Sequence, residues 1–132
     1  MTFVDASAIV AMLTEEADGD LLAERLATYP RGTTSAIAVY EAVVAIARRR
    51  TWAIDEAAKL VAEFMALAQI EIIPIGDAEG RAAIEAFDRF GKGRHPAKLN
   101  MGDCFAYACA KVHGAPLLFK GDDFAKTDIV AA

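Results

Sequence analysis

Carboxylates stand alone in four apolar stretches of this sequence. Asp5 is the only charged residue of MTFVDASAIVAML, Glu41 that of TTSAIAVYEAVVAIA, and Asp103 that of LNMGDCFAYACA. The fourth position is the pair Asp122–Asp123, which follows the apolar run APLLF. Burying an ionised carboxylate is unfavourable unless a partner compensates its charge, and a divalent cation is a common partner. If the fold brings these positions together, they form an oxygen-ligand site suited to Mg²⁺ or Mn²⁺.

Each carboxylate also has a structural explanation that the sequence leaves open. Asp5 could cap the helix that follows it, and Glu41 could be a solvated helix residue, although its apolar neighbours at helical spacing disfavour this. Asp103 stands three residues after Asn100, as in a capping box, where the helix dipole would lower the pKa of its carboxyl. The pair Asp122–Asp123 could belong to an ordinary turn.

The elements that must position these residues alternate between short strands and longer helices. We expect strands at residues 2–4, 31–34, 70–75 and 117–119, a further edge strand at 128–130, and helices at residues 7–13, 18–27, 36–50, 56–68, 78–90 and 101–113. The expected N-cap residues of the last four helices are Ser35, Asp55, Asp77 and Asn100.

This alternation predicts an α/β fold with a mostly parallel sheet. Ligands bind beyond the carboxyl ends of the strands in such sheets. Asp5 directly follows the first predicted strand, and Asp122–Asp123 follow the strand at 117–119. Asp5 and the Asp122–Asp123 pair would therefore lie at the same edge of the sheet if these two strands are parallel.

The composition limits the class of protein. A length of 132 residues suits one domain, residues 1–132, and a net charge of −5 argues against coating nucleic acid by bulk charge. No apolar run approaches the roughly 20 residues that span a bilayer, and the N-terminus lacks the basic start of a signal peptide. Cys104 and Cys109 fall in one predicted helix, too far apart to pair, so we expect a reduced, cytoplasmic setting without membrane contact.

Four segments of the sequence resemble signature blocks of PIN-domain proteins, and are most similar to the VapC toxins of VapBC toxin–antitoxin pairs. The segments are FVDASAIVAML, TSAIAVYEAVVAIARR, GKGRHPAKLNMGDCFAYACAK and PLLFKGDDFAKTDI, and the resemblance runs from Thr2 to about Ile129. It implies a three-layer α/β/α sandwich. It also implies a Mg²⁺- or Mn²⁺-dependent endoribonuclease toxin that forms a homodimer and is silenced by a VapB-type antitoxin.

The resemblance further implies roles for individual residues. Asp5 and Asp103 correspond to the acids that bind the metal ion, and Glu41 corresponds to a supporting acid. Either residue of the Asp122–Asp123 pair is the fourth acid. Ser7 matches a small polar position that supports the first acid. The implied reaction is hydrolysis of RNA that leaves a 5′-phosphate and a 3′-hydroxyl.

A basic loop provides candidate RNA contacts. Arg89, Lys92, Arg94 and Lys98 lie in a stretch rich in glycine, which lets the backbone approach a phosphate chain. An ordinary solvated basic loop explains the same residues equally well, and the sequence leaves both readings open.

Two other functional classes fit the sequence poorly. Aspartate-nucleophile phosphatases need a second aspartate two residues after the first, where this chain has Ser7. The GxxxxGK[ST] motif of P-loop nucleotide-binding proteins is missing. The alternative that remains is a catalytically weak PIN-like domain that mainly binds protein or RNA, but all four acid positions are filled, which favours an active site.

Overall fold

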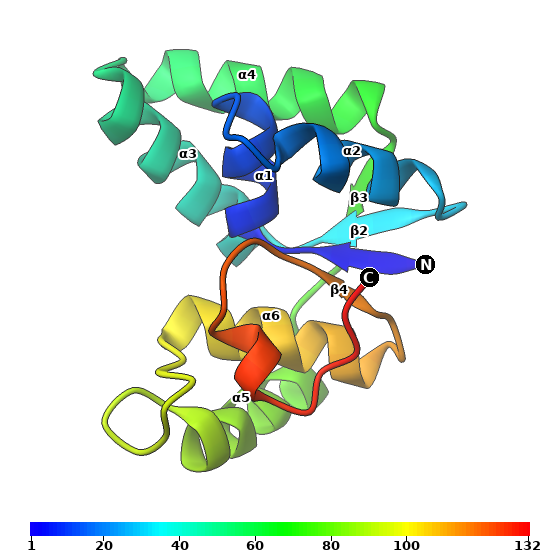
Figure 1. The fold of residues 1–132 in the computed structure, drawn as a ribbon, viewed down its shortest axis with the longest axis vertical. Coiled ribbons are helices and arrows are strands. Elements are labelled where there is room, and N and C mark those ends of the chain that lie inside the picture. Colours follow the sequence, from blue (N-terminus) through cyan, green and yellow to red (C-terminus); the bar gives the residue numbers. More distant parts are fainter.

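Four parallel strands form the centre of the protein, in the order β3-β2-β1-β4 (Figure 1). The strands are β1 (Thr2–Val4), β2 (Gly32–Thr34), β3 (Ile70–Ile72) and β4 (Leu117–Leu118). Phe3 of β1 pairs with Thr33 on one side and with Leu117 on the other, so β1 is a central strand. The coordinates are a computed structural model that describes residues 1–132.

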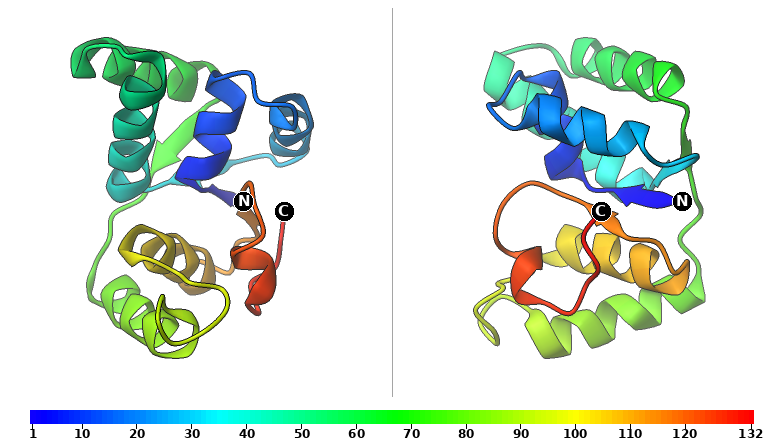
Figure 2. Two further views of the ribbon diagram at one scale, coloured as in Figure 1. Left: turned by 60° about the vertical axis from the view of Figure 1, so that its left-hand side comes forward. Right: turned by 45° about the vertical axis from the view of Figure 1, so that its right-hand side comes forward.

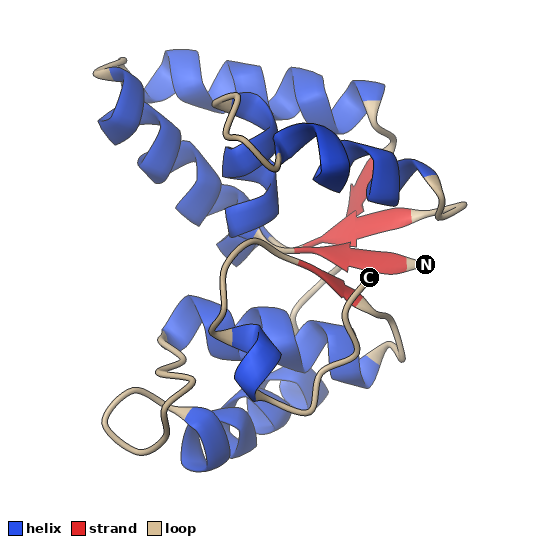
Figure 3. Cartoon of the chain, viewed as in Figure 1, coloured by secondary structure: helices blue, strands red, loops and turns tan.

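Helices cover both faces of this sheet, which gives the expected three layers (Figure 2, Figure 3). They are α1 (Ala6–Leu13), α2 (Gly19–Ala27), α3 (Ala36–Arg50), α4 (Ile54–Leu67), α5 (Asp77–Phe90) and α6 (Met101–Val112), with a short 3₁₀ helix at Phe124–Lys126. In Figure 1, helices α1 to α4 lie above the sheet and α5 and α6 lie below it. The predicted α/β/α architecture with a parallel sheet is confirmed.

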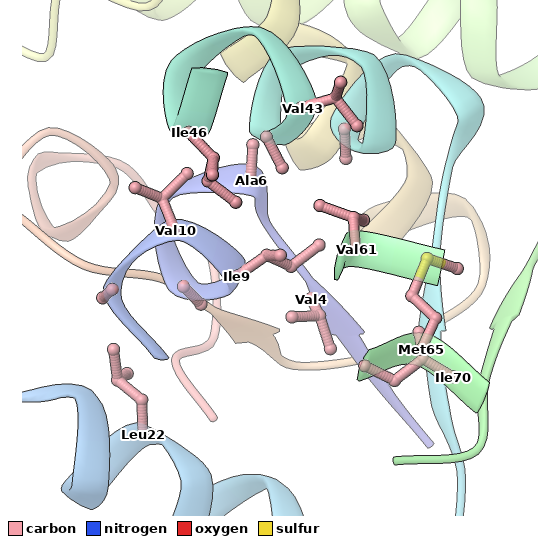
Figure 4. Packing of buried hydrophobic residues seen from close by; sticks show 14 of the residues in the cluster. Val4, Ala6, Ile9, Val10, Leu22, Val43, Ile46, Val61, Met65 and Ile70 are labelled. Atoms are coloured by element: carbon pink, nitrogen blue, oxygen red, sulfur yellow. The ribbon is translucent and has the colours of Figure 1, made fainter. Parts of the chain in front are cut away.

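Each face of the sheet has its own hydrophobic core, because successive side chains of a strand point to opposite faces. Val4 and Leu118 belong to the core shared with α1 to α4, where Ile9 and Ile46 are fully buried (Figure 4). The neighbouring residues of the same strands, Phe3 and Leu117, belong to the second core, shared with α5 and α6. The strands are thus buried on both sides, as parallel strands usually are.

Two of the predicted N-caps are confirmed. Ser35 Oγ accepts a hydrogen bond from the backbone N–H of Ala38 at 3.1 Å, and α3 begins at the expected residue. Asn100 Oδ1 accepts from the N–H of Asp103 at 2.9 Å at the start of α6. Each cap thus satisfies one of the backbone N–H groups that the first turn of a helix leaves without an intrahelical partner.

The other two predicted N-caps are wrong by one or two residues. Helix α4 is capped at Ala53, and Asp55 lies inside its first turn. Helix α5 is capped at Gly76, whose N–H donates to the Glu79 carboxylate at 2.9 Å, and Asp77 is its first residue. An acid in the first turn still favours the helix through the dipole, so the sequence signal marks the helix but not its first residue.

The edge strand expected at 128–130 does not form. Only an isolated bridge joins this region to β4, with Leu117 N–H donating to Val130 O at 2.8 Å and Ala132 N–H donating to Leu117 O at 2.9 Å. The side chain of Asp128 instead accepts a hydrogen bond from Tyr107 Oη at 2.5 Å, on α6. This contact holds the segment at Asp128 against α6.

The two cysteines lie inside the second core. Cys104 and Cys109 are both buried and unpaired, as expected from their positions in one helix. Burial raises the pKa of each thiol to about 11, so both remain protonated near neutral pH. None of the helices is both long enough and apolar enough to cross a membrane.

Candidate active site

The carboxyl ends of β1 and β4 form the edge where the candidate residues meet. From β1 the chain proceeds to β2 and β3 on one side of the sheet, whereas β4 lies on the other side of β1. A crevice is expected at such a switch point in an open parallel sheet. A cavity of about 470 Å³ opens here, and four predicted acids line it: Asp5, Asp103, Asp122 and Asp123.

Asp5 is the innermost of these acids. It follows β1 directly and caps α1, because its Oδ2 accepts hydrogen bonds from the Ser7 N–H at 3.0 Å and from the Ser7 hydroxyl at 2.5 Å. Only 4% of Asp5 is exposed. Burial raises the pKa of its carboxyl, and the two bonds from Ser7 oppose this rise. Asp5 therefore both caps α1 and lines the cavity.

Asp103 also both accepts a capping hydrogen bond and lines the cavity. Its Oδ2 accepts from the Asn100 N–H at 3.1 Å, which completes the predicted capping box. The expectation that the helix dipole lowers the pKa of Asp103 is wrong. Burial, together with the charges of Asp5 and Asp123, outweighs the Asn100 bond and raises this pKa to about 6.

Glu41 approaches the same region from α3. Its carboxylate is half-buried and makes neither a hydrogen bond nor a salt bridge with any residue of the protein. Burial raises its pKa to about 7, and the charges of Asp5 and Asp103 add to this effect. Glu41 lines a second cavity of about 400 Å³ that shares Ser7 and Lys120 with the first.

The Asp122–Asp123 pair lies in the turn that follows β4. Gly121, with a φ of 101°, supplies the left-handed conformation that this turn requires. Both aspartates are exposed and line the main cavity. The charge of Asp123 contributes to the raised pKa of Asp103, so Asp123 lies close enough to Asp103 to interact with it electrostatically.

The charges of three acids at this edge are not compensated. No lysine, arginine or histidine forms a salt bridge with Asp5, Glu41 or Asp103. Carboxylate oxygens of this kind suit Mg²⁺ or Mn²⁺ in chemical type. No three acidic, histidine or cysteine side chains are placed so that all could hold one ion without moving. The donor set thus fits a hard cation, whereas the ligand geometry is not preformed.

Of the four basic residues predicted to bind RNA, only Lys98 lines the main cavity. Arg94 instead pairs with Asp88 of its own segment at 2.8 Å. Arg89 pairs with Asp128 at 3.4 Å, and the exposed Lys92 does not line the cavity.

Sequence reasoning missed several charged residues beside the site. Lys120 and Lys126 flank the Asp122–Asp123 turn and line the main cavity. Glu16 pairs with both Lys120 and Arg49, and the bond from Lys120 lowers the pKa of the Glu16 carboxyl. The block KGDDFAK could have indicated the two lysines, but nothing in the segment TEEADGD singles out Glu16.

Comparison with known proteins identifies the family of this chain. The family model of the PIN domain matches residues 2–130. The protein named Ribonuclease VapC of Mycolicibacterium smegmatis is 40% identical over 128 residues, which cover 97% of each chain. A VapC ribonuclease of Rhizobium meliloti is 40% identical over 141 residues, covering 98% of this chain and 99% of the relative.

Solved structures show the same fold. The crystal structure of Mycobacterium tuberculosis VapC20, titled a Sarcin-Ricin loop cleaving toxin, has a TM-score of 0.77 at 19% identity and covers 100% of this chain and 98% of that chain. A toxin–antitoxin complex from Klebsiella pneumoniae has a TM-score of 0.72 at 19% identity, with coverage of 100% and 97%. The chain therefore belongs to the PIN-domain family and, within it, to the VapC-type proteins, as the signature blocks predicted.

Proposed function

We propose that this protein is a divalent-metal-dependent endoribonuclease and the toxin of a type II toxin–antitoxin pair. Its relatives at 40% identity are named VapC ribonucleases. The observation that carries the proposal is the proximity of Asp5, Glu41 and Asp103, from three separate elements, without a salt bridge to any of them. A structural role alone would not leave all three charges uncompensated.

Asp5 and Asp103 are the residues that would hold Mg²⁺ or Mn²⁺, and Glu41 would be the supporting acid beside them. When bound, such an ion neutralises charge on a phosphodiester and lowers the pKa of a water molecule. Binding would require the acidic side chains to move closer together. Their mutual repulsion, which adds to the effect of burial on the pKa of Glu41, opposes this approach until a cation is present.

The surrounding residues have distinct tasks in this proposal. Ser7 orients the Asp5 carboxylate through two hydrogen bonds, and Asn100 orients Asp103 through its N–H. Glu41, with a pKa of about 7, can hold or release a proton at its carboxylate near neutral pH. Lys98 and Lys126, at the rim of the cavity, would attract the RNA phosphates on either side of the scissile bond.

The partners follow from the same family membership. A solved structure with this fold is a toxin–antitoxin complex, which supports a VapB-type antitoxin as the protein that silences this one. The proposed substrate class is structured RNA, in line with the name ribonuclease shared by the relatives. Self-association as a homodimer and a cytoplasmic setting complete the proposal.

Isosteric variants of the two innermost acids test it most directly. Asparagine can replace the capping oxygens of Asp5 and Asp103, so Asp5→Asn and Asp103→Asn should keep both helix starts. Purified protein free of antitoxin is incubated with structured RNAs in Mg²⁺, Mn²⁺ or EDTA. We expect the wild-type protein to cleave RNA only with a divalent ion and to leave 5′-phosphates. We expect the cleavage rate of each variant to be at least about 100-fold lower.

Circular dichroism checks that the variants are folded. Cleavage that persists in EDTA, or in both variants, would overturn the proposal. Binding of RNA without cleavage under all conditions would instead support a catalytically weak domain that acts as a binding module.

A further inference from the structure

Gly102, the second residue of α6, makes room for the Glu41 carboxylate. A Cβ atom built on Gly102 would lie closer than 3.0 Å to the Cδ, Oε1 and Oε2 atoms of Glu41. Real Cβ atoms essentially never approach other atoms so closely. The carboxylate therefore occupies the space where any other residue at position 102 would place its side chain.

The backbone itself does not require glycine at this position. The glycines with positive φ are Gly93, Gly114 and Gly121, whereas Gly102 is in a regular helical turn. A helical glycine is about 1 kcal/mol less favourable than alanine. Folding alone would therefore favour alanine at position 102, and the observed glycine is explained by what lies against it.

The atoms that fill this space belong to a side chain and not to a neighbouring backbone. The three nearest heavy atoms to the missing Cβ are all at the end of the flexible Glu41 side chain. A methyl group at position 102 can therefore be accommodated by rotation of Glu41, without separation of α3 from α6. The fold would survive such a change, but the carboxylate would leave its place.

We propose that Gly102 is a positioning residue, whose lack of a side chain lets Glu41 hold its carboxylate beside Asp103 at the sheet edge. Gly102 directly precedes Asp103, so the same helical turn supplies one acid and the space for another. The inference rests on the proposed nuclease function for its effect on activity. The position of the Glu41 carboxylate does not depend on that function.

The test compares Gly102→Ala with Gly80→Ala. Gly80 is also helical, in α5, and nothing lies within 4 Å of its missing Cβ. Both variants gain the helix propensity of alanine, so both should fold and melt at or above the wild-type temperature. We expect Gly80→Ala to cleave RNA at the wild-type rate and Gly102→Ala to show at least about a 10-fold lower kcat.

Three further measurements separate positioning from a general packing effect. A crystal structure of Gly102→Ala should show the Glu41 carboxylate displaced with α3 and α6 unmoved. Calorimetric titration should show weaker Mn²⁺ binding in Gly102→Ala than in Gly80→Ala. In a Glu41→Ala background, Gly102→Ala should cause no further loss of cleavage.

Three outcomes would overturn the inference. The first is a crystal structure in which Glu41 has not moved and the helices have shifted. The others are an equal loss of cleavage in the Glu41→Ala background, and a wild-type kcat together with a displaced carboxylate. Wild-type protein that cleaves no RNA would count against the proposed function only. A displaced Glu41 and weakened Mn²⁺ binding would then still support the positioning role of Gly102.

Discussion

The backbone N–H of Lys120 donates a hydrogen bond to the Ser7 hydroxyl at 3.0 Å, across 113 positions of the sequence. The same hydroxyl donates to Asp5 Oδ2 at 2.5 Å. One side chain thus joins the start of α1 to the turn after β4. These two segments supply Asp5 and the Asp122–Asp123 pair, so Ser7 adds a side-chain link to the pairing of β1 with β4 that already joins them.

Replacing Ser7 by alanine should loosen this junction. Ser7→Ala removes both bonds of the hydroxyl, one of them to a carboxylate, and we expect a loss of about 1–2 kcal/mol in the free energy of unfolding. We also expect about a 10-fold loss of cleavage, because Asp5 loses one of its two bonds from Ser7. Urea unfolding and an RNA cleavage assay measure the two effects. Ser7→Thr keeps a hydroxyl and should retain most of both properties; an equal loss in Ser7→Thr would contradict this explanation.

The raised pKa of Glu41 predicts a dependence of stability on pH. The pKa is about 7 in the folded protein, against 4.5 for the ordinary side chain. The folded state therefore binds more protons between these values, and the contribution of Glu41 to stability falls as the pH rises through this window. Glu41→Gln stays neutral and avoids the loss. We expect the metal-free variant to be more stable than wild type at pH 8, by about 1 kcal/mol after solvent screening of this half-exposed group.

The difference between the two proteins cancels the titration of groups that do not interact with Glu41, and leaves that of Glu41 with its effect on Asp5 and Asp103. Glu16 and Asp128 have lowered pKa values and affect the pH dependence in the opposite direction, but equally in both proteins. Urea unfolding at pH 4 should show no difference, because Glu41 is then protonated. Mg²⁺ added at pH 8 should stabilise wild type more than Glu41→Gln. A variant less stable than wild type at pH 8 without metal would show that the Glu41 charge is compensated.

The two aspartates after β4 should differ in importance. Asp123 interacts electrostatically with Asp103, whereas both aspartates are exposed at the cavity. We expect Asp123→Asn to lower cleavage at least about 10-fold and Asp122→Asn to lower it less than about 3-fold. Because both side chains are exposed, neither variant should unfold at a lower temperature. The reverse order of activities would assign the fourth acid to Asp122.

The sequence predicted those features that depend on local patterns. Ser35 and Asn100 begin their helices as expected, because a capping side chain bonds to a backbone N–H three residues away. The place of Asp5 at the sheet edge followed from one more assumption, that β1 and β4 are parallel, which is confirmed. Local bonding and strand direction together predicted the place of Asp5 and of the Asp122–Asp123 pair, but not that of Glu41 or Asp103, which lie on helices.

Properties that depend on distant residues were not predictable in this way. The raised pKa of Asp103 results from burial and from Asp5, 98 positions earlier in the chain, so the local helix dipole gave the wrong direction. The ion pair between Glu16 and Lys120 joins segments that no sequence pattern relates. The role of Gly102 likewise depends on Glu41 of another helix. Such features arise when tertiary packing brings distant elements together.

The distribution of basic residues predicts which of them bind RNA. Lys98 lines the cavity and Lys92 of the same loop does not. Lys98 has a φ of 53°, a conformation that asparagine tolerates better than alanine, so Lys98→Asn removes the charge with little strain. We expect Lys98→Asn to weaken RNA binding and to reduce the slope of log K against log salt by about 1.

Binding is measured by fluorescence anisotropy over a range of salt concentrations, in the Asp5→Asn background so that the RNA stays intact. Lys92→Asn, in the same background, is the matched control and should leave affinity and slope close to those of the parent. Equal effects of the two substitutions would mean that the whole loop attracts RNA by its net charge. An effect of Lys98→Asn alone would place a phosphate of the bound RNA at the rim of the carboxylate cavity, because Lys98 lines that cavity and Lys92 does not.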